Sequence, residues 1–426
     1  MLTAASLFIV VSSLLISIIL IRQMLFTGLF LVKSKKQTQT AALPVANERL
    51  PSVTVLIPAH NEEMVIAGCL EAMRKISYPS EKLKIIVIND RSSDKTGEIA
   101  DTFAKQDPRI QVFHRDKDAI PGKPAALADT IQNSESDVFV FFDADYLPQR
   151  GLVRKLVAPF QDPRIGATMG RVVPYNTDRN LLTKLIDLER RAGYAIDQNM
   201  RHQLGLLPQF GGTCGAVRRS DLEAIGGWLT EVLTEDTDLT YRLFLKGKTV
   251  AYVADALCYE ESPEDWKVRF KQVRRWSYGH NDCLFRYFFP VLLTSKQGFF
   301  AKLDAAIVLL FYAVPTLAML TLFSALLIPT ITGVLGPLVI LVPTIAVFCS
   351  FGNFAPYFQI AAGCVNDRQP MAFMAAPVLY LSSFISMAAS VAGLFGLLHD
   401  RLFKIAPHWD KTTRFRDLEQ RRSLQK

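Results

Sequence analysis

Three acidic clusters stand in order through the middle of this 426-residue chain and are followed by a basic, aromatic segment. The clusters are Asp90, Asp143-Ala144-Asp145 and Glu235-Asp236, and the segment is Gln272-Val273-Arg274-Arg275-Trp276. Paired carboxylates are hard oxygen ligands for Mg²⁺ or Mn²⁺, and a separate carboxylate can accept a proton from a hydroxyl. Cationic and amide groups can stabilise a leaving diphosphate. The spacing therefore indicates metal-assisted group transfer from a donor that carries a diphosphate.

The segments around these clusters alternate between short apolar strands and helices. Such alternation predicts an α/β fold with a mostly parallel sheet covered by helices on both faces. Ligands of these sheets bind beyond the carboxyl ends of the strands, where Asp90, Asp143 and Asp145 are expected to converge. Strands are expected over residues 53–57, 83–89, 110–113 and 137–142, and helices over residues 63–76, 96–106 and 123–132.

Helical spacing of apolar and charged residues recurs over residues 180–200 and 262–286. The second helix is expected to begin with Ser262 as its N-cap and Pro263 at the first helical position. A helix lying on the membrane surface and a helix packed on the soluble core both fit residues 262–286.

On that helix, Gln272, Arg275 and Trp276 lie at positions i, i+3 and i+4 and so share one face. Arg275 can neutralise a diphosphate, Gln272 can hydrogen-bond to it, and Trp276 offers a flat ring on which a sugar can stack. A membrane-surface helix with snorkelling arginines explains the same three residues without chemistry.

The chain is too apolar for a purely soluble protein, since half of its residues are hydrophobic. Leu2 to Ile21 carries no charge and is long enough to cross a bilayer, with Arg22 free to reach toward one interface. The stretches 305–366 and 369–399 are also uncharged and hold three crossings comfortably, or four with strain. A broken or re-entrant helix is an alternative near residues 354–364.

Charge and cysteine usage exclude several classes of protein. The net charge of +8 is explained by cations that flank the apolar segments, so no nucleic-acid partner is expected. The six cysteines lack paired metal-ligand spacing, which argues against zinc and against a disulfide framework. There is no phosphate-binding loop ending in Lys-Ser/Thr and no dinucleotide fingerprint, so kinase, ATPase and dehydrogenase functions lose their basis.

The order and spacing of the clusters over roughly residues 50–300 resemble a family 2 glycosyltransferase of the glycosyltransferase-A fold. Gln272-x-x-Arg275-Trp276 resembles the element found in the processive synthases of cellulose, chitin, hyaluronan and mannan. The resemblance implies a metal held by Asp145 with Asp143, the catalytic base Asp236 and its neighbour Glu235. It also implies donor contacts from Ala59, Glu62, Asp90, Lys123, Asp143, Gln272 and Arg275, and acceptor contacts from Phe210, Gly211, Gly212, Thr213 and Trp276.

The expected organisation runs from an N-terminal transmembrane helix to a basic tail. The segments are a helix over 1–32, a linker over 33–52, a catalytic domain over 53–260, interfacial helices over 261–302, three or four transmembrane helices over 303–400 and a tail over 401–426. The lysines after the first helix place the catalytic domain on the cytoplasmic side, at the inner membrane if the source is bacterial. Protein partners are unknown.

The expected reaction is inverting, processive transfer of a hexose from a nucleotide sugar to a growing β-linked polysaccharide, coupled to its translocation. UDP-glucose is the first candidate donor, followed by UDP-N-acetylglucosamine and GDP-mannose. The alternative is transfer of one sugar to a membrane lipid, and a second alternative is an inactive sugar sensor or transporter. An inactive sensor or transporter would be expected to lack a metal-binding carboxylate or the carboxylate that acts as the catalytic base, and neither is missing.

Overall fold

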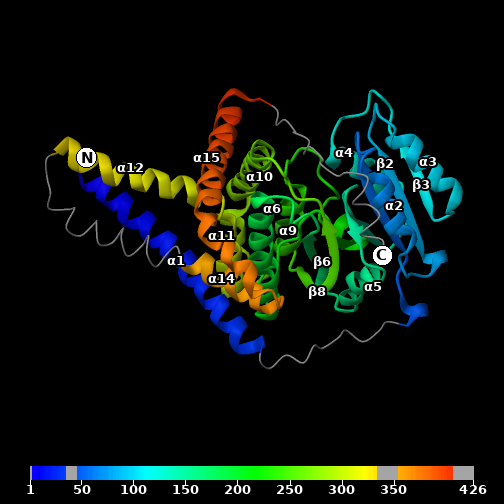
Figure 1. Ribbon diagram of the computed structural model, residues 1–426, viewed down its shortest axis with the longest axis horizontal. Coiled ribbons are helices and arrows are strands. Elements are labelled where there is room, and N and C mark those ends of the chain that lie inside the picture. The colour runs from blue at the N-terminus through cyan, green and yellow to red at the C-terminus, as the bar shows by residue number, and fades with distance from the viewer. Residues whose placement is uncertain (1, 35–45, 333–353, 406–426) are drawn as a thin grey trace.

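A computed structural model describes residues 2–34, 46–332 and 354–405, and Figure 1 shows an α/β domain joined to a set of apolar helices. The strands are β1 (Val53–Ala59), β2 (Leu83–Asn89), β3 (Ile110–His114), β4 (Val138–Phe141), β5 (Leu147–Pro148), β6 (Ile165–Pro174), β7 (Gly215–Arg218) and β8 (Thr249–Glu260). The helices of the domain are α2 (Ile66–Arg74), α3 (Thr96–Gln106), α4 (Lys123–Gln132), α5 (Leu152–Val157), α6 (Leu181–Arg190), α7 (Asn199–Gln203), α8 (Arg219–Ala224) and α9 (Glu235–Leu245).

One eight-stranded sheet, in the order β3-β2-β1-β4-β7-β6-β8-β5, forms the centre of the domain. The first four strands pair in parallel, as the alternating pattern predicts. The second half is mixed, since β7 is antiparallel to both β4 and β6, β8 is parallel to β6, and β5 is antiparallel to β8. The sheet is therefore mixed, with its parallel half formed by the segments that the sequence predicts.

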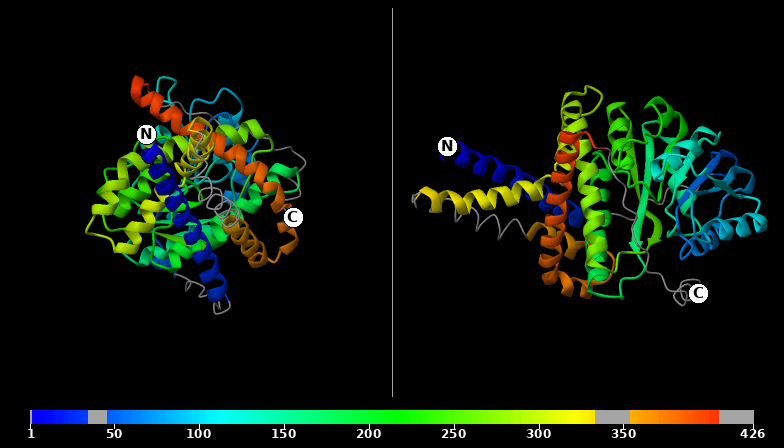
Figure 2. Two further views of the ribbon diagram at one scale, coloured as in Figure 1. Left: turned by 90° about the vertical axis from the view of Figure 1, so that its left-hand side faces the viewer. Right: turned by 90° about the horizontal axis from the view of Figure 1, so that it is seen from above.

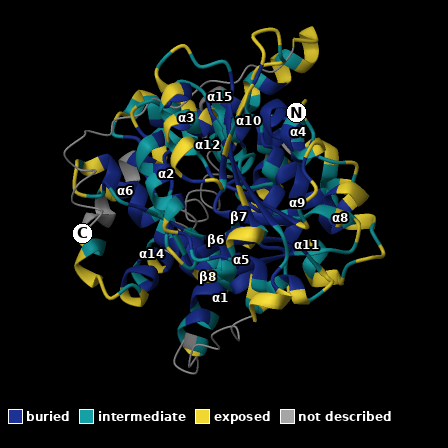
Figure 3. Ribbon diagram, turned by 90° about the vertical axis from the view of Figure 1, so that its right-hand side faces the viewer, coloured by how far each residue is buried: buried dark blue, intermediate teal, exposed yellow. Residues whose placement is uncertain are grey.

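The core lies between this sheet and the helices that cover it, and Figure 3 shows the central strands and the inner parts of these helices as buried. β1 and β2 are buried along almost their whole length because both of their faces are covered by helices. β4, which pairs with β1, is buried at all four positions. This rigid layer holds the loops that follow β1, β2 and β4 at one edge.

The helix expected over residues 180–200 contains a π-helical segment. Asn180 caps α6 by a reciprocal capping box with Thr183, and α6 then continues as the π-helix η4 (Arg191–Gln198) before α7. π-helical turns are rare and often mark functional sites. Here η4 packs against the apolar helices α1 and α14, so it joins the domain to these helices.

The long helix α10 (Trp266–Leu293) begins three residues later than the sequence predicts. Its N-cap is Asp265, whose side chain accepts hydrogen bonds from the amides of Lys267 and Val268. Ser262 is not the cap, because its amide and carbonyl are already bonded to the side chain of Asn176. The expectation of an N-cap at Ser262 is thus wrong, and a tertiary contact is the reason.

The apolar helices are α1 (Leu2–Ser34), α11 (Phe299–Leu309), α12 (Val314–Thr332), α14 (Phe354–Asn366) and α15 (Leu379–Phe403). Within the described ranges, Leu7–Lys33 and Ser382–Phe403 are each long and apolar enough to cross a membrane. The pair α11 and α12 passes the same test only together, and it is bent by 65°. The number of C-terminal crossings stays a prediction, because residues 333–353 lie outside the described residues.

The apolar helices do not all run in one direction. α1 and α12 extend away from the domain on the same side, whereas α15 lies alongside α10 and crosses the direction of α12 (Figures 1 and 2). The hydroxyl of Ser277 on α10 donates to the carbonyl of Ser390 on α15 at 2.7 Å, and Arg401 of α15 pairs with Asp282 of α10 at 2.7 Å. The glutamine-arginine-tryptophan segment therefore lies on a helix with the domain on one side and α15 on another.

The sequence predicts that Arg22 reaches toward an interface, but its side chain is buried among other elements. Its guanidinium donates to Asp304 on α11 at 2.5 Å and to Asp197 on η4 at 2.7 Å. It also lies over the ring of Phe26 at 4.1 Å. Both acids are distant in the sequence, so the pairing of this arginine of an apolar helix became visible only in the fold.

Candidate active site

A cavity of about 1010 Å³ opens beyond the carboxyl ends of β1, β2 and β4 and extends to the apolar helices. It brings together most of the sequence-predicted residues. Those that line it are Ala59, Glu62, Asp90, Lys123, Asp143, Asp145, Gly211, Thr213, Glu235, Asp236, Gln272, Arg275 and Trp276. Phe210 and Gly212 do not line it.

Asp90, after β2, is fixed by three donors. Its carboxylate accepts from Arg115 Nη1 at 2.7 Å, from Arg91 Nε at 2.9 Å and from the amide of Gly122 at 3.0 Å. Burial raises the pKa of Asp90, but the hydrogen bonds outweigh burial and leave the pKa below its usual value. Asp90 is therefore an ionised group held rigidly at the end of the cavity nearest β1 and β2.

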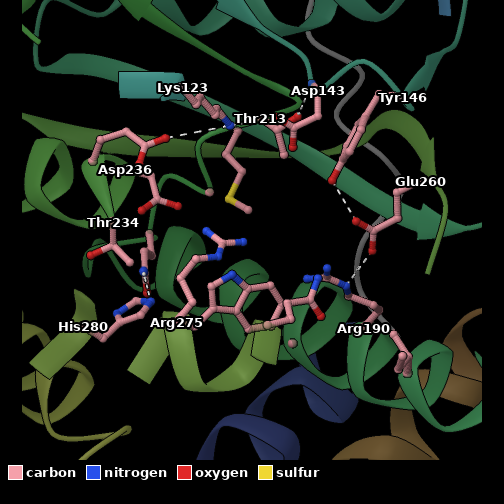
Figure 4. A pocket seen from close by; sticks show the side chains of 18 of the residues that line it. Lys123, Asp143, Tyr146, Arg190, Thr213, Thr234, Asp236, Glu260, Arg275 and His280 are labelled. Atoms are coloured by element: carbon pink, nitrogen blue, oxygen red, sulfur yellow. Dashed lines mark hydrogen bonds and ion pairs between the residues drawn. The ribbon is translucent and has the colours of Figure 1, made fainter. Parts of the chain in front are cut away.

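Lys123 connects the acidic groups. Its ammonium donates to Asp143 Oδ1 at 2.7 Å and to the carbonyl of Gly212 at 3.1 Å, and it lies 3.8 Å from Glu235 Oε1. Burial lowers its pKa, but the carboxylates outweigh burial and raise the pKa above the usual value. Lys123 is thus a fixed cation between the loop after β4 and the start of α9, as Figure 4 shows.

The two carboxylates after β4 both face the cavity. The amide of Asp143 donates to Thr213 Oγ1 at 3.1 Å, and Asp145 accepts from the amide of Glu261 at 3.4 Å. Two carboxylates one residue apart fit a magnesium or manganese ion whose other ligands are water and diphosphate oxygens. Within the described part of the chain, no group of three acidic, histidine or cysteine side chains forms a complete protein metal cage. Asp143 and Asp145 therefore suit a metal that is shared with a donor.

Glu235 and Asp236 occupy the first turn of α9, where the helix dipole favours negative charge. Burial raises the pKa of Glu235 to about 7, and burial also raises the pKa of Asp236. Asp236 Oδ1 accepts from the amide of Thr237 at 2.6 Å, which fixes its orientation. A half-buried, oriented carboxylate with a raised pKa suits a general base.

Gly212 supports that base from behind. Its φ of +70° is accessible to glycine at little cost, and an added Cβ would lie 3.1 Å from Asp236 Cβ and 3.2 Å from Asp236 Oδ2. Phe210 is fully buried and packs edge-on against Phe141, at 5.9 Å between ring centroids. This part of the predicted acceptor segment therefore shapes the base and the core, while Gly211 and Thr213 remain on the cavity wall.

Arg275 projects from α10 into the cavity, opposite Lys123 and Asp143 (Figure 4). Gln272 accepts from Arg269 Nη1 at 2.9 Å. The ring of Trp276 has the guanidinium of Arg269 at 5.4 Å and that of Arg190 at 5.8 Å. The predicted sharing of one helix face is confirmed, and the ring of Trp276 already has two cationic neighbours.

Sequence reasoning missed a chain of polar groups at the other end of the site. Tyr146 donates to Glu260 Oε2 at 2.7 Å, and Arg190 pairs with Glu260 Oε1 at 2.8 Å (Figure 4). No local pattern marks Arg190, which is brought to β8 by α6. Glu260 stands in the Glu260-Glu261-Ser262-Pro263 run, and that cluster after a strand was the available signal.

His280 was also missed. It lies behind the base, with Nδ1 3.4 Å from Thr237 Oγ1, and its ring stacks on Tyr312 at 4.5 Å. Burial lowers the pKa of His280 to about 4, so the imidazole is neutral near pH 7. Tyr312 stands in the turn between α11 and α12, so His280 links the base to the bend of the apolar helices.

The chain belongs to glycosyltransferase family 2, because residues 51–279, more than half of its length, match the description "glycosyltransferase like family 2". It is 37% identical over 242 residues to a probable glycosyltransferase, YdaM, of Bacillus subtilis, covering 56% of this chain and 58% of that protein. It is 30% identical over 280 residues to a beta-monoglucosyldiacylglycerol synthase of Synechocystis, and the match covers 65% of this chain and 57% of that protein.

A third relative is a poly-beta-1,6-N-acetyl-D-glucosamine synthase of Staphylococcus epidermidis, 26% identical over 272 residues, covering 64% of this chain and 65% of that one. The chain thus spans about three fifths of the length of these relatives. A solved mannosyltransferase of Pyrobaculum calidifontis, in complex with GDP-Man and Mn²⁺, shares the fold with a TM-score of 0.55 at 19% identity. The match covers 83% of this chain and 98% of that one. The fold is accordingly of the glycosyltransferase-A type.

Proposed function

We propose that this enzyme transfers a hexose, with inversion, from a nucleotide diphosphate sugar to a hydroxyl group that is delivered from the membrane. The observation that carries this proposal is that one cavity is shared by the α/β domain and the apolar helices. Its wall includes the carboxylates of the α/β domain and also Gln23 of α1, Phe311 of the turn between α11 and α12, and Gln359 of α14. Donor chemistry and the apolar helices therefore share one space.

In this proposal Asp236 accepts the proton of the acceptor hydroxyl while the oxygen of that hydroxyl attacks the anomeric carbon. The bond between that carbon and the diphosphate oxygen breaks, and the nucleoside diphosphate leaves with the electron pair. Lys123 and Arg275 stabilise the negative charge of the leaving group from opposite walls. An α-linked donor would give a β-linked product.

Asp145, with Asp143, would hold the divalent cation. When bound, Mg²⁺ or Mn²⁺ supplies positive charge that offsets the diphosphate. Ala59, Glu62 and Asp90 surround the end of the cavity proposed for the nucleoside. UDP-glucose is the first donor to test, with UDP-N-acetylglucosamine and GDP-mannose as the next two.

We place a membrane lipid first as the acceptor. The cavity wall contains apolar residues of the bend and of α14, namely Phe311, Tyr312, Pro356 and Ile360. The similarity to synthases named for a glucosylated diacylglycerol supports the same choice. We further propose that the domain faces the cytoplasm, where nucleotide sugars are made, as the lysines after α1 indicate.

A growing polysaccharide is the second candidate, and one observation favours it. Gln272, Arg275 and Trp276 all line the cavity, as a processive enzyme of this family would require. The relative named as a poly-N-acetylglucosamine synthase is consistent with this candidate. An inactive sensor has no such support, because the carboxylates for metal and base both converge on the cavity.

The test uses purified full-length protein in lipid nanodiscs with a panel of labelled nucleotide sugars and either MgCl₂ or MnCl₂. The proposal expects a labelled product in the organic phase that carries one hexose. A ladder of labelled, water-soluble or insoluble glycan would support the second candidate instead. Label that stays on the nucleotide with every donor and both metals would reject transfer altogether.

A further inference from the structure

A buried ion cluster lies where the cavity meets the apolar helices. Arg22 of α1 pairs with Asp197 and Asp304, and Asp197 also pairs with Arg201. Burial raises the pKa of Asp197, but the two arginines outweigh burial and hold it below the usual value. Two cations and two anions make the cluster neutral overall.

Three side chains on the cavity wall beside this cluster keep polar atoms without a hydrogen-bond partner in the described ranges. Arg201 is 3% exposed, and its Nε and Nη1 are buried donors that bond to nothing. Gln359 is 5% exposed, and its Nε2 is also a buried donor without a hydrogen-bond partner. Gln23 offers a buried acceptor, Oε1. All three line the cavity.

Buried polar groups normally find partners, because leaving one unpaired forfeits its interaction with water. Three such groups on one wall therefore indicate a polar ligand rather than a packing fault. None of them takes part in the donor chemistry proposed above, since they stand on α1, α7 and α14. The two N–H groups of Arg201 and the amide of Gln359 would donate, and Gln23 would accept.

We infer that these residues form the headgroup subsite for a neutral glycerolipid with a free hydroxyl, such as a diacylglycerol. Its ester carbonyls would accept from Arg201 and Gln359, which leaves its single hydroxyl for Asp236. Because Asp197 already balances Arg201, the subsite gains little from an added negative charge. Neutral lipids are therefore favoured over phosphate-bearing ones.

The same wall connects this subsite to the base. Phe311 lies under the guanidinium groups of Arg22 and Arg201, at 5.5 and 5.9 Å. The next residue, Tyr312, stacks on His280, which stands 3.4 Å from Thr237 Oγ1 beside Asp236. The aromatic side chains of Phe311, Tyr312 and His280 thus connect the subsite to the catalytic carboxylate. This inference rests on the proposed function and names its acceptor class.

Binding of dioleoylglycerol to the full-length protein in detergent tests the inference by native mass spectrometry, without any donor. Gln359→Leu and Arg201→Lys should each lower the bound fraction about tenfold, the loss expected from removing a buried hydrogen bond. Asn366→Leu makes the same type of change at an exposed position of α14 and should bind as the parent does. Gln359→Leu removes only an unpaired amide and so should preserve the fold.

Equal binding of dioleoylglycerol by the parent and Gln359→Leu would overturn the inference. Tighter binding of dioleoyl phosphatidic acid, or of a β-linked glucan oligosaccharide, would overturn it as well. Failure of this inference can be told apart from failure of the proposed function. If the variants weaken lipid binding but the protein transfers no hexose, the function is rejected and the subsite is kept. If the protein glycosylates lipid but the variants bind lipid as the parent does, the subsite is rejected and the function is kept.

Discussion

Replacement of Gly212 by alanine should reduce turnover by displacing the base. The added Cβ meets Asp236 Cβ at 3.1 Å and Oδ2 at 3.2 Å, so the carboxylate must move by a few tenths of an ångström. A misplacement of about 1 Å costs about 10²-fold in rate, so we expect kcat to fall roughly tenfold. The φ of +70° adds a backbone cost of about 1–2 kcal/mol.

Gly205→Ala is the matched control. Gly205 has a φ of +66°, and an added Cβ meets nothing within 4 Å. Both variants should therefore lose about 1–2 kcal/mol of stability, a fall in Tm of roughly 2–8 °C for a domain of this size. Only Gly212→Ala should lose kcat. Equal kcat in the two variants, measured with the donor that the nucleotide-sugar panel identifies, would refute the role of Gly212 in positioning Asp236.

Four further predictions concern the base, its neighbour, the aromatic ring and the topology. Asp236→Asn should keep donor affinity in a nucleotide-binding assay and lose transfer, since the amide cannot take the proton; loss of both would make Asp236 a binding residue. The pKa of Glu235 is raised from 4.5 to about 7 in the native state, so the unfolded chain loses this proton first and the native state loses stability as pH rises through that interval. Glu235→Gln should therefore flatten the fall of Tm between about pH 5 and 7. An unchanged slope counts against this assignment. Trp276→Ala should lose about 0.5–2 kcal/mol of cation–π and stacking energy and weaken acceptor binding, with Phe restoring part of it, and unaltered acceptor KM would contradict this. A cysteine placed next to Lys36 should be labelled only from the cytoplasmic side, and labelling from outside would invert the topology.

The parallel half of the sheet was predictable because each of its strands is a short apolar run. β2, α3 and α4 have the boundaries that the sequence predicts. The second half was not, because its strands pair across long separations and β8 carries exposed positions that break its apolar pattern. The antiparallel insertion of β7 between β4 and β6 joins residues about 45 to 80 positions apart, and no local signal encodes that.

The candidate site divides in the same way. Clustered carboxylates such as Asp143 and Asp145 were readable, because like charges side by side have little structural use. Phe210 was assigned to acceptor binding by its motif, yet its side chain is buried in the core. Arg190 and His280 were missed because each acquires its role from a partner on another element.

Transfer of labelled hexose to diacylglycerol in proteoliposomes tests the central claim most directly. The parent enzyme, given the donor and metal that the panel identifies, should yield a lipid-soluble product with one β-linked hexose. Asp236→Asn, in the same membranes and at the same protein level, should yield none. A product that is a polymer, or one that Asp236→Asn makes as fast as the parent, would contradict the claim.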